Sequence, residues 1–278
     1  MNIKLSIITV TFNSENVIKD LIETILKSKI ENSEIVIVDC ASTDKTIEII
    51  KKYPEVKLIE SKVNLGYARG NNLGVKNSKG KYILFLNPDV RVPEEGINRL
   101  LNFYESNEDM GAVSPKLVFP NGKMQKSVRK LPTLKRAFME YFLNKRAEYD
   151  EFTPSSNEPV AVECIYTAVF LMSRSLFESI KGFDEKYFLY YEDIDLCKKI
   201  IQKGKKIYYY PEVEFTHELG HSKVSEKKLP LGIRTLALFT PIKTSGKMYY
   251  LISDGNIYHG VFTATLIRLI IYVSTKLK

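Results

Sequence analysis

Polar side chains follow the apolar runs in the first 90 residues of this 278-residue chain. Thr11 and Asn13 follow the first run, Asp39 the second, and Asn87 and Asp89 the fourth. In open parallel sheets, ligands bind outside the carboxyl ends of the strands, so these side chains are expected to meet in one crevice. Asp39 can accept the imide N–H of a pyrimidine, and Asp89 can bind a divalent cation that bridges a diphosphate. The pattern predicts a nucleoside-diphosphate site.

A second acidic cluster lies at the start of a helix predicted over 193–203. It contains Glu192, Asp193 and Asp195, and Tyr190 and Tyr191 come just before it. Acidic residues at a helix N-terminus also act as caps that the helix dipole favours, so capping is the competing interpretation. A general base there would need burial by the two tyrosines to raise its proton affinity.

A histidine completes the set of candidates. His217 lies in a polar stretch that follows a strand predicted over 206–210, and His221 follows on the same predicted loop. A lone loop histidine is usually a surface residue, so its type and position alone do not establish a role.

Alternating strands and helices are expected to hold these residues in place. Short apolar runs alternate with helical periods from residue 1 to about 90, which is typical of βαβ units that build a parallel sheet. Strands are predicted over 5–10, 35–38, 56–60 and 82–86, and helices over 17–26, 43–52 and 67–77. Further on, we expect helices over 94–104 and 137–146 and strands over 112–118 and 160–172. Gly66, Gly70 and Gly74 are spaced by four, which favours tight helix packing.

The remaining segments predict a domain of residues 1–228 with a helical extension over 229–278. Residues 1–90 form its expected nucleotide-binding half and residues 91–228 its acceptor-binding half. The apolar stretch 257–274 contains His259 and Arg268, which favours an interfacial or core-packed helix over a spanning one. With the basic segment 123–136, this extension is expected to contact an anionic membrane surface. The alternatives are packing on the sheet or a homo-oligomer contact.

Composition narrows the class of protein. The chain has 41 Lys+Arg against 33 Asp+Glu, a net charge of +8, and 44% hydrophobic residues, as in a globular chain. Charge alone does not distinguish nucleic acid, membrane or phosphorylated substrates. Three separated cysteines indicate neither a disulfide framework nor a zinc site, and no signal peptide is expected. We therefore expect a cytoplasmic protein. The sequence contains neither a dinucleotide fingerprint nor a Walker motif.

Five sequence blocks together resemble the family 2 glycosyltransferases of GT-A fold, in particular their rhamnosyltransferase-like branch. In order and spacing they cover roughly residues 4 to 221. The blocks are Ser6–Asn13, Ile37–Asp44, Asn64–Gly74, Leu86–Val90 and Gly182–Asp195. The resemblance implies an α/β fold with a Rossmann-like, mostly parallel sheet flanked by helices.

The resemblance also implies roles for individual residues. The nucleotide would contact Thr11, Asn13, Asp39, Arg69 and Asn87, the metal would contact Asp89 and His217, Asp193 would be the general base, and the acceptor would contact Glu192 and Tyr191. Asn87 stands where the family's D-x-D element has its first acidic residue, so metal affinity is expected to be modest. Carboxylate and diphosphate ligands suit Mg²⁺ or Mn²⁺, and an imidazole ligand favours Mn²⁺ slightly.

The expected reaction is metal-dependent, inverting transfer of a sugar from a nucleotide-diphosphate donor to a hydroxyl of a glycan or a polyprenyl-diphosphate-linked glycan. The family-level expectation is rhamnose from dTDP-rhamnose, used in cell-surface polysaccharide synthesis at the inner face of the plasma membrane. The chain has no Trp and so lacks the Q-x-x-R-W element of processive synthases, which predicts single additions. A nucleic-acid partner is not expected. The alternatives are a sugar-nucleotide nucleotidyltransferase and an inactive glycan-binding or membrane-adaptor module.

Overall fold

A computed structural model describes residues 3–132, 151–218, 240–244 and 247–251. The strands are β1 (Leu5–Thr11), β2 (Ser33–Cys40), β3 (Val56–Ser61), β4 (Tyr82–Leu86), β5 (Val90–Arg91), β6 (Met110–Val118), β7 (Val128–Arg129), β8 (Val160–Val162), β9 (Cys164–Ile165), β10 (Val169–Ser173), β11 (Lys206–His217), β12 (Thr240–Thr244) and β13 (Lys247–Leu251). The helices are α1 (Ile18–Lys27), α2 (Thr46–Ile50), α3 (Gly66–Lys76), α4 (Gly96–Glu105), α6 (Arg174–Ser179) and α7 (Glu192–Gln202).

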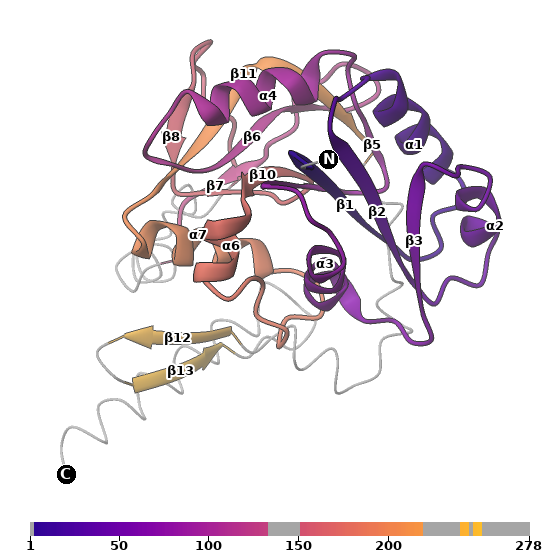
Figure 1. Ribbon diagram of the computed structural model, residues 1–278. Coiled ribbons are helices and arrows are strands. Elements are labelled where there is room, and N and C mark those ends of the chain that lie inside the picture. Colours follow the sequence, from indigo (N-terminus) through magenta and orange to yellow (C-terminus); the bar gives the residue numbers. More distant parts are fainter. Residues whose placement is uncertain (1–2, 133–150, 219–239, 245–246, 252–278) are drawn as a thin grey trace.

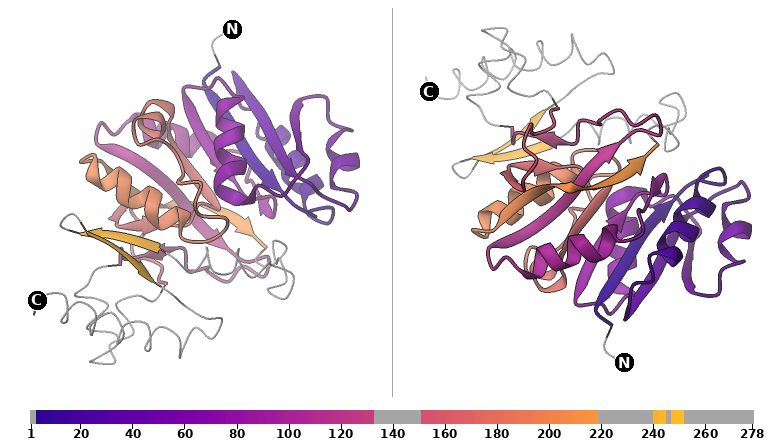
Figure 2. Two further views of the ribbon diagram at one scale, coloured as in Figure 1. Left: turned by 90° about the horizontal axis from the view of Figure 1, so that it is seen from below. Right: turned by 90° about the horizontal axis from the view of Figure 1, so that it is seen from above.

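A nine-stranded sheet forms the centre of the molecule. Its strand order is β3-β2-β1-β4-β10-β6-β11-β5, and β8 also pairs with β11. The first four of these strands are mutually parallel, whereas β10 is antiparallel to both β4 and β6. Figure 1 shows α1 and α4 above the sheet and α3, α6 and α7 below it, and Figure 2 gives the views from below and above. The predicted α/β architecture is confirmed.

The apolar runs of the first 90 residues become buried strands because helices cover both faces of the sheet. Helix α1 buries Ile18, Leu21, Ile22 and Ile25 on one face, at the helical spacing expected from the sequence. Helix α3 packs closely on β1 and β2 through its glycines: a Cβ on Gly70 or Gly74 would approach side chains of these strands to 2.8 and 2.5 Å. The predicted packing role of these glycines is therefore confirmed for Gly70 and Gly74.

The second half departs from the predicted elements in two places. The single strand expected over 160–172 is divided into β8, β9 and β10. Strand β11 runs on to His217, because the chain bulges after Tyr210 and regains its pairing with β6 at Glu214. His217 is therefore a strand residue and not a loop residue, and the strand predicted to stop at Tyr210 was ended too early.

Part of the predicted helical extension is a hairpin. Strands β12 and β13 pair antiparallel, with Thr244 opposite Lys247 and two residues between them. The prediction of helix is wrong for these ten residues: two short runs on either side of a Ser-Gly pair favour a hairpin. The other residues of 229–278, including the apolar stretch 257–274, and the helix expected over 137–146 lie outside the described residues.

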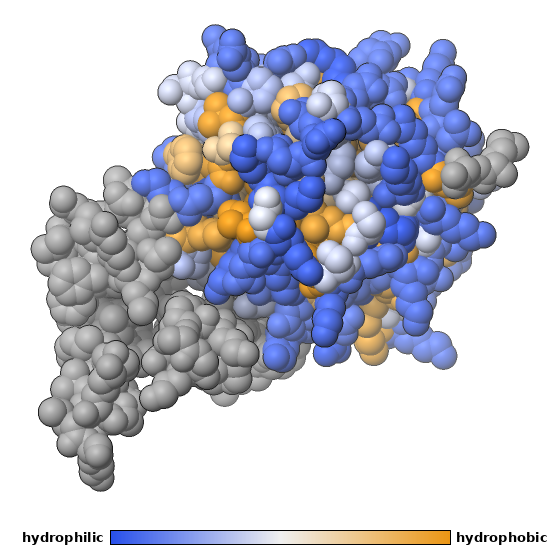
Figure 3. Space-filling model, turned by 60° about the vertical axis from the view of Figure 1, so that its left-hand side comes forward, coloured by the Kyte–Doolittle hydropathy of each residue, from blue (hydrophilic) through white to orange (hydrophobic). Residues whose placement is uncertain are grey.

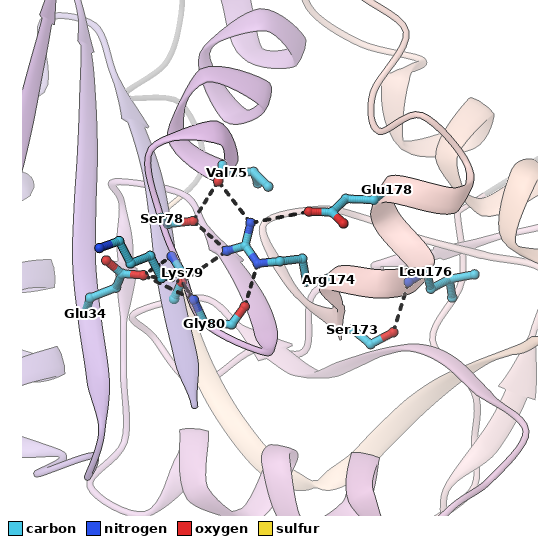
Figure 4. A network of polar contacts seen from close by, with 10 residues as sticks. Glu34, Val75, Ser78, Lys79, Gly80, Ser173, Arg174, Leu176 and Glu178 are labelled. Carbon is cyan, nitrogen blue, oxygen red and sulfur yellow. Dashed lines mark hydrogen bonds and ion pairs between the residues drawn. The ribbon is translucent and has the colours of Figure 1, made fainter. Parts of the chain in front are cut away.

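Arg174 joins the two halves of the sheet at its amino edge. Its guanidinium donates to the backbone oxygens of Gly80 and Val75 at 2.6 and 3.0 Å and to Ser78 Oγ at 2.8 Å. In Figure 4 this side chain extends from the start of α6 into the turn before β4, where Glu34 accepts the backbone N–H groups of Lys79 and Gly80. This network orders the edge opposite the carboxyl ends of the parallel strands.

The described surface is mainly polar. On the face in Figure 3, hydrophilic side chains dominate and hydrophobic ones form small separate patches. No helix within the described ranges is long and apolar enough to cross a membrane. The exposed large hydrophobic side chains of these ranges are Val63, Met124, Tyr190, Tyr191 and Ile201.

Candidate active site

The first part of the site lies where β1 and β2 end. Thr11 Oγ1 donates to Asp39 Oδ1 at 3.0 Å, and the backbone N–H of Ser42 donates to Asp39 Oδ2 at 2.9 Å. The Ser42 hydroxyl also donates to Oδ1. Asp39 is fully buried, with 0% of its surface exposed. The structure thus brings Thr11 and Asp39 together as predicted, and it uses most of the carboxylate's acceptor capacity within the protein.

Asn13 joins the loops that follow β1 and β2. Its φ of 52° lies in the left-handed region, which asparagine tolerates better than most residues. Its backbone N–H donates to Ser42 Oγ, and its Oδ1 accepts the backbone N–H of Thr43, both at 2.8 Å. Asn13 therefore shapes the nucleotide side of the crevice through backbone contacts. The direct nucleotide contact that the resemblance implies for Asn13 stays a prediction.

Asp44 also organises this side of the site, a role that the sequence analysis did not assign. It accepts the backbone N–H groups of Glu15 at 3.1 Å and Thr46 at 3.0 Å, and the Thr46 hydroxyl. Burial alone would raise its pKa, but the hydrogen bonds from Thr46 and Glu15 hold the pKa of Asp44 below its ordinary value. This carboxylate stays ionised and ties the β1 loop to α2.

Asp89 and His217 face each other in the interior. Their exposed fractions are 4% and 3%, and Nε2 of His217 lies 3.2 Å from Oδ1 of Asp89. The contact is not aligned as a hydrogen bond, and Asp89 Oδ1 has no hydrogen-bond partner. On its other side, Nδ1 of His217 lies 3.0 Å from Oε1 of Gln125. Because an amide oxygen only accepts, Nδ1 of His217 donates to Gln125, and Nε2 is the ring nitrogen that faces Asp89.

This pair fits a divalent cation. A buried carboxylate oxygen without a donor and an imidazole nitrogen held by its other nitrogen are the usual features of metal ligands. Adjacent ligands of an octahedral ion with bonds of about 2.1 Å lie about 3 Å apart, close to the separation of Nε2 and Oδ1. Within the described ranges no three His, Cys, Asp or Glu side chains cluster for a metal. The remaining ligand positions would fall to diphosphate oxygens and water.

The second acidic cluster lies at the N-terminus of α7. Glu192 is buried, and burial together with the neighbouring charge of Asp193 raises its pKa. Burial also raises the pKa of Asp193, against the hydrogen bond from the Ile194 N–H and the charge of Arg129, both of which lower it. Asp193 is the more accessible of the two, so it suits a general base that must reach a substrate hydroxyl.

Tyr190 and Tyr191 precede this helix in an unusual backbone conformation. Their φ angles are 71° and 68°, in the left-handed region, where a residue with a side chain is strained by about 1 kcal/mol or more. Both rings are exposed, by 65% and 44%. They therefore do not bury the base as the sequence analysis had expected; the interior itself does so, and Tyr191 is left at the surface beside Glu192.

Four consecutive residues, 165–168, contact several of these elements. The backbone oxygen of Ile165 accepts from Cys197 Sγ at 3.8 Å, and that of Thr167 accepts from Tyr67 Oη at 2.8 Å. The backbone oxygen of Ala168 accepts the N–H of Asn87 at 2.9 Å, and the N–H of Tyr166 donates to the backbone oxygen of Ser127 at 3.0 Å. The turn between β9 and β10, here called the hub (residues 165–168), thus contacts α7, α3, the Asn87–Asp89 turn and β7. One short segment therefore lies against the turn that carries Asp89 and against the helix that carries Asp193.

Among the described residues, Arg69 forms an ion pair with Glu185 and with none of the other candidate residues. It is exposed and lies 3.7 Å from Glu185. It belongs to a contact between α3 and the segment before α7, in which the side-chain amide of Asn72 accepts from the N–H of Phe183 at 3.1 Å and donates to its oxygen at 3.0 Å. Direct diphosphate binding by Arg69 would require this ion pair to open.

The sequence analysis missed a second group of polar side chains beside the base. Arg129 forms an ion pair with Glu151, and its guanidinium lies 4.9 Å from the ring centre of Tyr166. Burial and the hydrogen bond to Glu151 raise the pKa of Tyr166. Arg129 had been counted only as part of a basic surface segment. No sequence signal distinguishes it from its neighbours Lys126 and Lys130, because its partner lies 22 residues away.

Comparisons with known proteins show the family of this chain. Residues 6–180 match the model of the family "Glycosyl transferase family 2", so the chain belongs to that family. Residues 150–222 match "N-terminal domain of galactosyltransferase". The N-acetylglucosaminyl-diphospho-decaprenol L-rhamnosyltransferase of Mycobacterium tuberculosis is 30% identical over 208 residues, 68% of this chain and 67% of that protein. The rhamnosyltransferase WbbL of Escherichia coli is 29% identical over 231 residues, 79% of this chain and 85% of that protein.

Solved structures share the fold. S. aureus TarS 1-349 in complex with UDP superposes with a TM-score of 0.57 at 19% identity, over 78% of this chain and 61% of that chain. GalNAc-T7 with UDP, GalNAc and Mn²⁺ gives a TM-score of 0.61 at 15% identity, over 78% and 44%. This chain thus spans less than two thirds of either solved chain. It is a glycosyltransferase of GT-A fold, as the sequence resemblance implied.

Proposed function

We propose that this glycosyltransferase moves one hexose at a time, with inversion and with a divalent cation, from a nucleoside diphosphate to a hydroxyl of a lipid-linked glycan. The observation that carries the proposal is the hub, which contacts both the Asn87–Asp89 turn and the helix of Asp193. These contacts support a single site in which one group would hold the leaving diphosphate and another would take the acceptor proton. Rhamnose from a dTDP donor is the proposed sugar, because two relatives are rhamnosyltransferases.

Each side of the crevice has a separate task in this reaction. Thr11, Asn13 and Asp39 shape the nucleotide side, and Asp39 Oδ2, which accepts one hydrogen bond, keeps a second acceptor position for the imide N–H of a pyrimidine. Asp89 and His217 would hold Mg²⁺ or Mn²⁺, which supplies positive charge to the departing diphosphate. Arg69 would add charge on opening its contact with Glu185.

Asp193 acts on the acceptor. Its carboxylate takes the proton of the attacking hydroxyl as that oxygen approaches the anomeric carbon from the face opposite the diphosphate, which inverts the configuration. A raised pKa makes this carboxylate a better proton acceptor than an ordinary surface aspartate. Glu192 and Tyr191 flank this position, and we propose that they contact the acceptor.

A donor screen by product mass tests the proposal. The protein is incubated with dTDP, UDP and GDP sugars, Mn²⁺ and a polyprenyl-diphosphate-linked N-acetylglucosamine acceptor, and products are weighed with and without chelator. The expected result is one added hexose, lost on chelation and in Asp193→Asn. Release of inorganic pyrophosphate from nucleoside triphosphate and sugar phosphate would instead indicate a nucleotidyltransferase. Binding of glycan without any product would indicate an inactive module.

Membrane contact is proposed separately and rests on residues 229–278 and the basic segment 123–136. Within residues 123–129 the membrane contact would fall to the exposed Lys123 and Lys126, because Arg129 forms an ion pair with Glu151. Flotation with anionic and neutral vesicles tests it. We expect binding to anionic vesicles that weakens with salt and on removal of 229–278. Equal indifference to both vesicles would contradict it.

A further inference from the structure

Buried polar atoms without partners are concentrated in the active site. Seven such side-chain atoms occur in the described residues, and five of them are Asp89 Oδ1, Gln125 Nε2, Ser127 Oγ, Arg129 Nε and Glu192 Oε2. Buried polar groups are normally hydrogen-bonded, and a buried polar atom without a hydrogen-bond partner lowers the stability of the fold. This concentration therefore indicates atoms kept for a ligand. Asp89 and Glu192 already have proposed roles, whereas the other three have none.

These three atoms belong to one face of one extended segment. Gln125, Ser127 and Arg129 occupy alternate positions, and successive side chains of an extended chain point to opposite sides. Burial alternates over 124–127, where Met124 and Lys126 are exposed and Gln125 and Ser127 are buried; Val128 is buried in the core as well, and Arg129 is partly buried. The segment is fixed at both ends, because the Gln125 N–H donates to Leu117 O at 2.9 Å and Ser127 O accepts from the hub.

The two ends of this segment lie at the two reactive groups. Gln125 contacts His217 at 3.0 Å, beside Asp89. Arg129 is paired with Cys164 in β9, a strand that packs on α7, and its charge acts on Asp193. Four residues of extended chain span about 13 Å. The segment therefore runs from the proposed metal ligands to the proposed base, with Ser127 in the middle.

We propose that Gln125, Ser127 and Arg129 form a sugar-binding strip that hydrogen-bonds the hydroxyls of the transferred hexose, with Ser127 as its specificity-determining contact. The inference rests on the proposed function, because in that reaction the hexose lies between diphosphate and acceptor hydroxyl. The chemistry suits hydroxyl groups: the strip offers two N–H donors and one hydroxyl. Glu151 neutralises Arg129, which disfavours a phosphate there.

Ser127→Ala tests the strip against a matched control. Thr9 Oγ1 in β1 is also buried without a partner, so Thr9→Val removes an orphan hydroxyl elsewhere. Calorimetry measures the affinities for dTDP and dTDP-L-rhamnose, and for UDP and UDP-GlcNAc. Ser127→Ala is expected to weaken binding of the sugar nucleotide about 3- to 10-fold. The affinity for the nucleoside diphosphate without a sugar should stay unchanged. Thr9→Val is expected to change neither affinity. Arg129→Lys, which keeps the charge opposite Glu151, should lose affinity for the sugar nucleotide only.

The outcomes separate this inference from the proposed function. If the unmodified protein binds none of the four nucleotides, both are wrong. If it prefers a sugar nucleotide to its diphosphate and Ser127→Ala keeps that preference in full, the strip alone is wrong. Equal loss for diphosphate and sugar nucleotide would also overturn it, because Ser127 would then act on the fold and not on the hexose. Thermal melting of each variant identifies such a loss of fold.

Discussion

The two sides of the crevice are built on opposite principles. On the nucleotide side, Asp39 and Asp44 accept hydrogen bonds from neighbouring loops, and these bonds hold the pKa of Asp44 below its ordinary value. On the catalytic side, Glu192 and Asp89 keep oxygens without donors, and burial raises the pKa of Glu192. The first side is completed by the chain itself. The second is left incomplete, which costs stability and leaves polar atoms for the proposed contacts with substrate and cation.

The largest expected difference between the two sides is the effect of Asp193→Asn on turnover. Loss of a general base lowers the rate about 10²- to 10⁴-fold, and nucleotide affinity should change little because the base acts on the acceptor. Turnover and donor affinity by calorimetry check this. Asp195→Asn is the control, because this carboxylate lies two residues on and pairs with Lys199 at 2.8 Å. Turnover of Asp193→Asn within threefold of the unmodified protein would contradict the assignment.

Asp89→Ala should lower activity about 10²-fold and remove its dependence on added Mn²⁺. The reason is that the cation and its charge on the leaving diphosphate depend on this carboxylate. Rates are measured across a Mn²⁺ titration. Asp109→Asn serves as the control, since Asp109 forms an exposed pair with Lys206 at 2.7 Å. A variant that still requires Mn²⁺ at the same concentration would exclude Asp89 as a ligand.

Asp39→Ala tests whether the nucleotide side is held together by its own hydrogen bonds. The change leaves Thr11 and Ser42 without their acceptor, so the free energy of unfolding should fall by about 2–3 kcal/mol. Binding of dTDP should weaken even without metal. Urea unfolding and calorimetry measure the two effects. If a purine nucleotide binds the unmodified protein as tightly as dTDP or UDP, the role of Asp39 toward a pyrimidine is wrong.

Glu192→Gln should have the smallest effect, and it should stabilise. The pKa of Glu192 is higher in the folded protein than in the unfolded chain. As the pH rises from the unfolded-state pKa through the folded-state pKa, the fold therefore loses stability, because the unfolded chain releases the proton more readily. Removing the charge removes that loss. At a pH above the folded-state pKa of Glu192, the variant should melt about 2–4 °C higher than the unmodified protein. At low pH the two melting temperatures should be equal. A variant that melts lower at high pH would show that Glu192 is stabilised as an anion.

Local patterns in the sequence determined the nucleotide half. Strand β4 was predicted with its observed bounds, and α1 and α3 were predicted to within a residue or two, because apolar period and buried face coincide there. Thr11 and Asp39 follow adjacent parallel strands, so their proximity followed from topology alone. The family resemblance added the candidate roles of Asp89, Asp193 and His217.

Only the tertiary structure decided how the catalytic half is arranged. His217 was expected on a loop, and its burial depends on β11 continuing past a bulge to reach Asp89. The strip of Gln125, Ser127 and Arg129 could not be found from sequence. Its side-chain atoms are recognised by their lack of a hydrogen-bond partner in the folded protein, and the segment is held by the hub some 40 residues away. The periodicity of apolar residues indicates which face of a helix or strand is buried. Whether a buried polar atom finds a hydrogen-bond partner depends on every segment that packs around it.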